Sequence, residues 1–110
     1  MDIKKSAGLI MHPTALPSKY GIGEFGETSR SFIDFLNGSS TNIWQVLPLG
    51  LTSLDEFSPY SSPSSILGNR YLVDIEKLTK YEKIDIVTPQ FSNDFVQYKD
   101  VYKFKKIITK

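Results

Sequence analysis

The sequence predicts an α/β fold in which a helix joins two strands of a parallel sheet. Residues 8–11 and 43–49 are two short, mostly apolar segments closed by proline, a pattern typical of strands buried on both faces. The connection between them, about 30 residues, has the size of a βαβ unit. Such units form parallel sheets with right-handed crossovers, so the two strands are expected to be adjacent and parallel.

The first strand is expected at Leu9–Met11 and the crossover helix at Glu27–Asn37. Pro13 and Pro17 exclude a helix directly after the strand. Further on, apolar side chains recur at helical spacing and predict one buried helix face, made of Phe32, Ile33, Phe35 and Leu36. Gly38 then provides a C-terminal stop signal.

The second strand is expected at Ile43–Leu47, and a loop rich in serine and proline follows over residues 51–69. Loops of this length are usually functional or disordered. Residues 71–74 are compatible with a short strand, after which Asp74 is placed to cap a helix that ends near Lys80. A last amphipathic helix is expected from about Asp94, with its lysines on a solvated face.

Composition excludes several classes of function. Cysteine is absent and His12 is the one histidine, so disulfides, thiolate zinc sites and multi-histidine metal sites are excluded, and no metal or cofactor is expected. Thirteen basic residues against twelve acidic ones leave a net charge of +1, which favours neither nucleic acid nor an anionic membrane as a partner. The basic start, residues 1–5, is not followed by an apolar region of about 7–15 residues as in a secretory signal, so a cytoplasmic location is expected.

The three glycines of residues 21–26 match the G-x-G-x-x-G pattern of dinucleotide sites. The match is weak because the glycines lie too far from the first strand. In addition, the Glu24 carboxylate would repel a pyrophosphate. A structural loop is the favoured interpretation.

Two features could form a binding site. Tyr60 lies between Pro59 and Pro63 among serine hydroxyls, which suits stacking on a sugar ring, although a packed tyrosine in an ordinary loop is equally compatible. His12 follows the first strand, at the end of a parallel sheet that faces ligands in α/β folds. A lone histidine beside a proline is more often structural, so both interpretations of His12 remain open.

Six segments, in this order and spacing, resemble the start of the amylomaltases, which are 4-α-glucanotransferases. They are His12–Pro17, Tyr20–Gly23, Phe32–Leu36, Trp44–Gly50, Ser58–Tyr60 and Gly68–Leu72. The resemblance implies that residues 1–110 are the N-terminal part of a (β/α)₈ TIM barrel, incomplete here, with two or three parallel strands and their helices. The activity that the resemblance implies is the transfer of α-1,4-glucan segments between maltodextrins with retention of configuration.

The resemblance also implies which residues of this chain take part. Ser58, Pro59 and Tyr60 match the loop that lines the donor sugar site, and His12 is implied as a pocket-lining residue. No Asp or Glu matches the family's catalytic carboxylates, so no catalytic residue is expected in this chain and the isolated chain is expected to be inactive. The alternatives are a non-catalytic carbohydrate-binding remnant and a truncated fragment without function. The oligomeric state is open.

Overall fold

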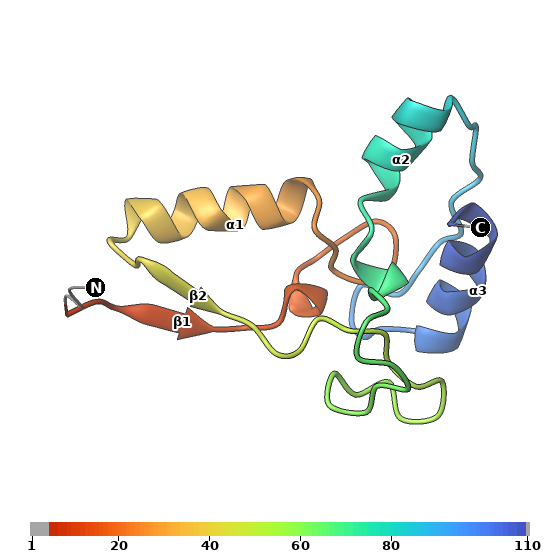
Figure 1. The fold of residues 1–110 in the computed structure, drawn as a ribbon. Helices are drawn as coiled ribbons and strands as arrows, with labels where there is room; N and C mark the ends of the chain where they lie inside the picture. The colour runs from red at the N-terminus through yellow and green to blue at the C-terminus, as the bar shows by residue number, and fades with distance from the viewer. Residues whose placement is uncertain (1–4, 110) are drawn as a thin grey trace.

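The structure is a computed structural model that describes residues 5–109. Residues 1–4 and 110 of the predicted 1–110 domain lie outside the described range. Most of the basic start, on which the expected cytoplasmic location is based, is therefore outside it as well. In chain order the elements are β1 (Gly8–Ile10), η1 (Pro13–Ala15), α1 (Glu27–Gly38), β2 (Ile43–Gln45), η2 (Arg70–Leu72), α2 (Ile75–Glu82) and α3 (Tyr98–Ile108). Figure 1 shows two halves: the strands with α1, and a second half that contains α2, α3 and a long loop.

The predicted βαβ unit is confirmed. β1 and β2 pair in parallel, with Leu9 opposite Trp44, and α1 runs alongside them (Figure 1). The ladder continues past β1, where the Met11 amide donates to the Gln45 carbonyl at 3.0 Å. The indole of Trp44 donates to the Met11 carbonyl at 2.7 Å, so the two strand ends are tied together by a side chain as well.

The expectation that these strands are buried on both faces is wrong for the described chain. Leu9 is 42% exposed, Ile10 67% and Ile43 50%. The predicted helix face is also only partly buried: Leu36 is buried and Phe32 packs on Trp44, whereas Ile33 and Phe35 are exposed. The reason is that α1 packs on the two-stranded sheet, and no other described element covers the remaining surfaces of the strands and of α1.

The main core lies in the second half instead. Two clusters of buried side chains form it: Tyr20, Ile75 and Phe104 in one, and Ile22, Tyr71 and Val101 in the other. Each cluster joins the glycine loop of residues 21–26, or its start, to residues of η2 or α2 and to α3. The stability of this half therefore depends on contacts between segments about 30 to 80 residues apart in the sequence.

Two predicted elements need correction. Residues 70–72 form a 3₁₀ turn rather than a strand, because the Asn69 side chain accepts from the Tyr71 amide and caps the turn. α3 begins at Tyr98 and not near Asp94, because the preceding residues form a turn in which Ser92 donates to the Gln97 side chain. The predicted cap of α2 is confirmed: the Asp74 carboxylate accepts from the Lys77 amide at 3.0 Å.

The glycine loop packs against its surroundings too closely for side chains. A Cβ on Gly23 would lie 2.0 Å from the Pro13 carbonyl oxygen, and one on Gly21, whose φ is +85°, would lie 2.7 Å from the side chains of Phe91 and Val101. The Gly23 amide also donates to the Thr14 carbonyl at 3.1 Å. These contacts explain Gly21 and Gly23 by packing, as the structural interpretation predicts, whereas a Cβ on Gly26 would lie 3.4 Å or more from its neighbours.

We expect Gly23→Ala to lower the free energy of unfolding by at least about 1–3 kcal/mol, because the added methyl group meets backbone atoms that cannot rotate away. The matched control is Gly38→Ala at the end of α1, where a Cβ meets nothing within 4 Å. That change should be neutral or stabilising by up to about 1 kcal/mol. Urea denaturation of both variants measures the difference, and equal effects would contradict the packing role of Gly23.

Candidate functional site

The carboxyl ends of β1 and β2 point toward the long loop of residues 51–67, called the serine loop below (Figure 1). Its ends are held together by an antiparallel bridge between Gly50 and Gly68 and by the Leu51 amide, which donates to the Leu67 carbonyl at 3.0 Å. In parallel α/β folds, ligand sites form from the loops on this side. The serine loop is thus on the side where a site is expected.

Tyr60 is the most exposed residue of the predicted site. Its side chain is 72% exposed, while Ser58 and Pro59 are half-buried. The Tyr60 amide donates to the Ser58 hydroxyl at 3.2 Å, and the Ser61 amide donates to the Ser58 carbonyl at 3.0 Å, which makes a tight turn around Pro59. The geometry leaves the aromatic ring free to stack on a flat apolar surface.

His12 is buried and hydrogen-bonded. Its Nδ1 accepts from the Thr14 amide at 3.3 Å and lies 2.7 Å from the Thr14 hydroxyl, and its Nε2 lies 3.4 Å from the Pro48 carbonyl. This pattern assigns the proton to Nε2, which donates to the carbonyl. His12 therefore ties the end of β1 to the chain beyond β2, as the structural interpretation expects.

The structure places the predicted site residues on the same side but does not join them by hydrogen bonds. The hydrogen bonds of His12 go to Thr14 and Pro48, and those of the serine loop stay within residues 50–68. A direct role of His12 at a substrate stays a prediction.

Burial lowers the pKa of the His12 imidazole, and the hydrogen bond to Pro48 offsets this in part. The folded imidazole therefore binds its proton more weakly than the unfolded one, whose pKa is about 6.5. It follows that the contribution of His12 to the free energy of unfolding rises with pH up to about 6.5 and falls on acidification.

We expect the stability advantage of the parent over His12→Asn to be larger at pH 7.5 than at pH 5, because asparagine does not titrate. Urea denaturation of both proteins at the two pH values tests this. Other titrating groups are present in both chains and cancel in the comparison. A gap that stays constant with pH would contradict the assignment of a neutral buried imidazole.

Phe57 anchors the serine loop to the second half of the fold, which the sequence analysis did not predict. Its ring stacks on Tyr98 at 4.9 Å between centroids, with an interplanar angle of 15°. Its φ of +55° is rare for a non-glycine residue. An aromatic residue directly before the Ser-Pro-Tyr segment is the signal that could have revealed this anchor.

A buried ion pair joins the glycine loop to α3. The Lys105 ammonium is fully buried and lies 2.6 Å from a carboxylate oxygen of Glu24, which is 7% exposed. Burial raises the pKa of the Glu24 carboxyl and lowers that of the Lys105 ammonium, and the opposite charge of each partner offsets the shift of the other. The pair joins residues 81 positions apart, so no local pattern in the sequence points to it.

The described residues contain no group of three or more His, Cys, Asp or Glu side chains that could hold a metal ion. Four acidic side chains, Glu24, Glu27, Asp74 and Glu76, form ion pairs with basic ones. Within residues 5–109, no helix is long and apolar enough to cross a membrane.

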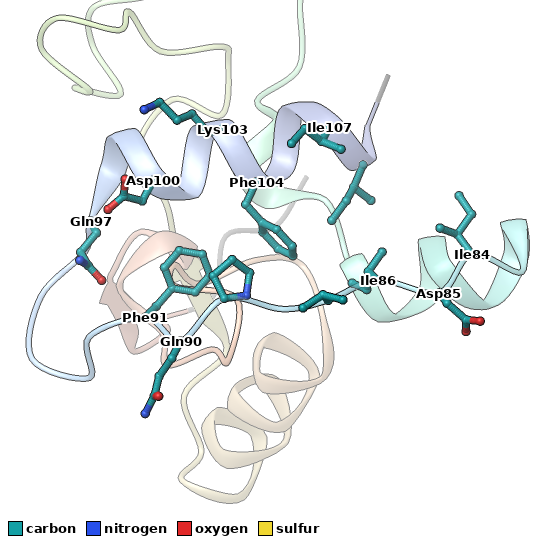
Figure 2. A pocket seen from close by; sticks show the side chains of 13 residues that line it. Ile84, Asp85, Ile86, Gln90, Phe91, Gln97, Asp100, Lys103, Phe104 and Ile107 are labelled. Atoms are coloured by element: carbon teal, nitrogen blue, oxygen red, sulfur yellow. The ribbon is translucent and has the colours of Figure 1, made fainter.

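A groove of about 650 Å³ lies between the segment of residues 84–91 and α3. Figure 2 shows Phe91 and Phe104 beside each other in it, with ring centroids 5.8 Å apart, and Gln90 pointing away from α3. Its lining is mainly aliphatic and aromatic, and it contains none of the predicted site residues. The groove therefore does not compete with the serine loop as a polar binding site.

Comparison with known proteins identifies close relatives. The family model described as 4-alpha-glucanotransferase matches residues 11–110. The 4-alpha-glucanotransferase of Thermus thermophilus is 39% identical over 105 residues, which are 96% of this chain and 21% of that protein. The one from Aquifex aeolicus is 43% identical over 102 residues, 91% of this chain and 21% of that protein.

A solved structure agrees with these sequences. It is the amylomaltase from Streptococcus agalactiae in complex with acarbose, which matches with a TM-score of 0.84 and 34% identity over 96% of this chain. The match covers 22% of the amylomaltase chain. The chain thus spans about a fifth of the length of the relatives it matches, and its fold corresponds to an incomplete part of the amylomaltase barrel.

Proposed function

The chain belongs to the 4-alpha-glucanotransferase family, and we propose from this that residues 1–110 are the first part of a catalytic barrel that transfers α-1,4-glucan segments between maltodextrins. The relatives matched are about five times longer, so most of such a barrel would be contributed by other residues. A location in the cytoplasm is part of the proposal.

The observation that carries the proposal is the exposed Tyr60 ring on a turn beyond the carboxyl ends of two parallel strands. Catalytic sites of (β/α)₈ barrels are built from loops at this end. The S. agalactiae amylomaltase holds acarbose, a glucan-like ligand, which supports an α-glucan as the substrate here.

We assign substrate-binding roles to Ser58, Pro59 and Tyr60. Pro59 stiffens the turn, Ser58 accepts from the Tyr60 amide and fixes its backbone, and the Tyr60 ring would pack on the apolar face of a glucose unit. We assign neither carboxylate of a retaining mechanism to this chain, because that mechanism needs two carboxyl groups about 5–5.5 Å apart and no motif here matches them. His12 would support the site by holding the strand ends in place.

The test is a chimera in which this chain replaces the matched part of the S. agalactiae amylomaltase. We expect the chimera to disproportionate maltotriose. Tyr60→Ala in the chimera should lower kcat/KM at least about tenfold, since it removes contact area at the sugar. It should change the free energy of unfolding by less than about 0.5 kcal/mol, because the ring is exposed.

The matched control is Tyr81→Ala on α2, because Tyr81 is 84% exposed and lies outside the serine loop. It should leave kcat/KM unchanged. A folded but inactive chimera would contradict the proposed function. If the chain nevertheless bound maltotriose, a non-catalytic carbohydrate-binding role would be favoured instead.

A further inference from the structure

The buried Lys105 ammonium has three protons and three acceptors. It donates to Glu24 Oε2 at 2.6 Å, to the Tyr71 carbonyl, and to the Val73 carbonyl at 3.4 Å. Since an ammonium group has three donors, its hydrogen-bonding capacity is used entirely within the protein. Lys105 thereby fastens α3 to the backbone of residues 71–73.

Glu24 completes this attachment from the other side. Its second carboxylate oxygen accepts from the Ile75 amide at 3.3 Å. The backbone is thus bound at residues 71, 73 and 75 by two side chains that come from distant parts of the sequence. Bonds of this charge-assisted kind are about twice as strong as neutral ones, so the segment is held firmly.

Tyr71 links this segment to the serine loop through Tyr98. Its hydroxyl donates to the Tyr98 carbonyl at 3.4 Å, and its ring meets the Tyr98 ring edge-to-face at 6.2 Å. Phe57 of the serine loop stacks on the same Tyr98 ring. The contacts therefore run from the ion pair through two tyrosines to the loop.

Inside the serine loop the hydrogen bonds are local. The Ser53 amide donates to the Ser61 carbonyl at 2.9 Å, and the Phe57 amide donates to the Ser53 carbonyl at 3.1 Å. These bonds shape the loop but do not orient it on the protein. The orientation of the loop on the protein depends on its two ends and on the stacking of Phe57 against Tyr98.

We propose that Glu24 and Lys105 are positioning residues for the serine loop: the ion pair fixes Tyr71, and Tyr71 and Tyr98 form the seat on which Phe57 holds the loop that presents Tyr60. The inference rests on the proposed function in that the loop is taken as the sugar-binding element. Neither residue of the pair contacts the substrate; both act through the aromatic seat.

The test uses the chimera described above as the parent protein and separates positioning from stability with the double variant Glu24→Leu/Lys105→Met. Apolar pairs of similar volume commonly replace a buried ion pair without loss of stability, so this variant should fold. Its Tyr71 carbonyl nevertheless lacks the charged donor. Hydrogen exchange of residues 53–61 should become about tenfold faster or more, as expected when a bond to a charged group is lost. Exchange in α1 should not change.

A second variant tests the contact between Tyr71 and Tyr98. Tyr71→Phe keeps the ring and removes the hydroxyl that bonds to Tyr98, so it should fold and should also speed exchange in residues 53–61. The inference is overturned by a folded double variant, or a folded Tyr71→Phe, whose loop exchanges as in the parent. It is equally overturned by a double variant that does not fold, or by a parent loop without protection.

Titration of the parent with maltotriose distinguishes this inference from the proposed function. If loop exchange is faster in the variants but the parent does not bind maltotriose, the positioning role is supported and the proposed sugar-binding function of the loop is contradicted. Binding of maltotriose that is as tight in the double variant as in the parent would overturn the role of the pair in presenting Tyr60.

Discussion

Replacing Lys105 alone by methionine is expected to unfold the second half of the chain. The change leaves the Glu24 carboxylate buried without its cation and removes a donor from the carbonyls of Tyr71 and Val73. Breaking a buried pair from one side costs about 3–5 kcal/mol. Since the whole stability of a small domain is about 5–15 kcal/mol, this loss is large enough to abolish folding of a marginal chain.

Circular dichroism and urea denaturation measure this effect. The matched control is Lys103→Met on the same helix, where the side chain is exposed and the change should stay within about 0.5 kcal/mol. Equal stability of the Lys105 variant and the parent would mean that the carboxylate is rehydrated or neutral, and the assignment of a buried charged pair would be wrong.

The 110-residue chain on its own is expected to form no product from maltotriose. Retention requires two carboxyl groups held across one glycosidic bond. In this chain Glu24, Glu27, Asp74 and Glu76 are bound to basic side chains, and Asp55 and Glu56 are neighbours in a loop. The exposed apolar surfaces of β1, β2 and α1 are also expected to make the isolated chain prone to aggregation.

The measurement is incubation of the purified chain with maltotriose, followed by detection of glucose and longer maltodextrins. The active chimera described above is the positive control, and a buffer blank is the negative one. Products above the blank would show that a nucleophile exists among the acidic residues of this chain. The family-based assignment of the catalytic carboxylates to other residues would then have to be abandoned.

Elements that depend on neighbouring residues could be predicted from the sequence. The βαβ unit follows from apolar runs and their spacing, and the cap at Asp74 follows from residues within one helical turn. The start of α3 could not be placed, because its boundary depends on a turn closed by the side chain of Gln97.

The burial of the strands and the long-range ion pair could not be predicted from the sequence, for a physical reason. The apolar runs at Leu9 and Ile43 indicate what a strand prefers to contact, and not whether a neighbour is present to cover it. Lys105 looks like one more solvated lysine in a basic helix, since its partner is 81 residues away. The exposure of Tyr60 was also open, because the prolines around it indicate a stiff backbone but not whether a neighbour covers the ring.

The distance in sequence between Glu24 and Lys105 has a consequence for the order in which the chain acquires its structure. A protein is synthesised from its N-terminus, so β1, α1 and β2 can assemble while later residues are still inside the ribosome. The glycine loop cannot, because Glu24 has no cation to bury with until α3 has emerged. The glycine loop is synthesised well before α3 but is therefore among the last parts of the described chain to become ordered, and slow translation after α2 would prolong the exposure of Tyr20 and Ile22.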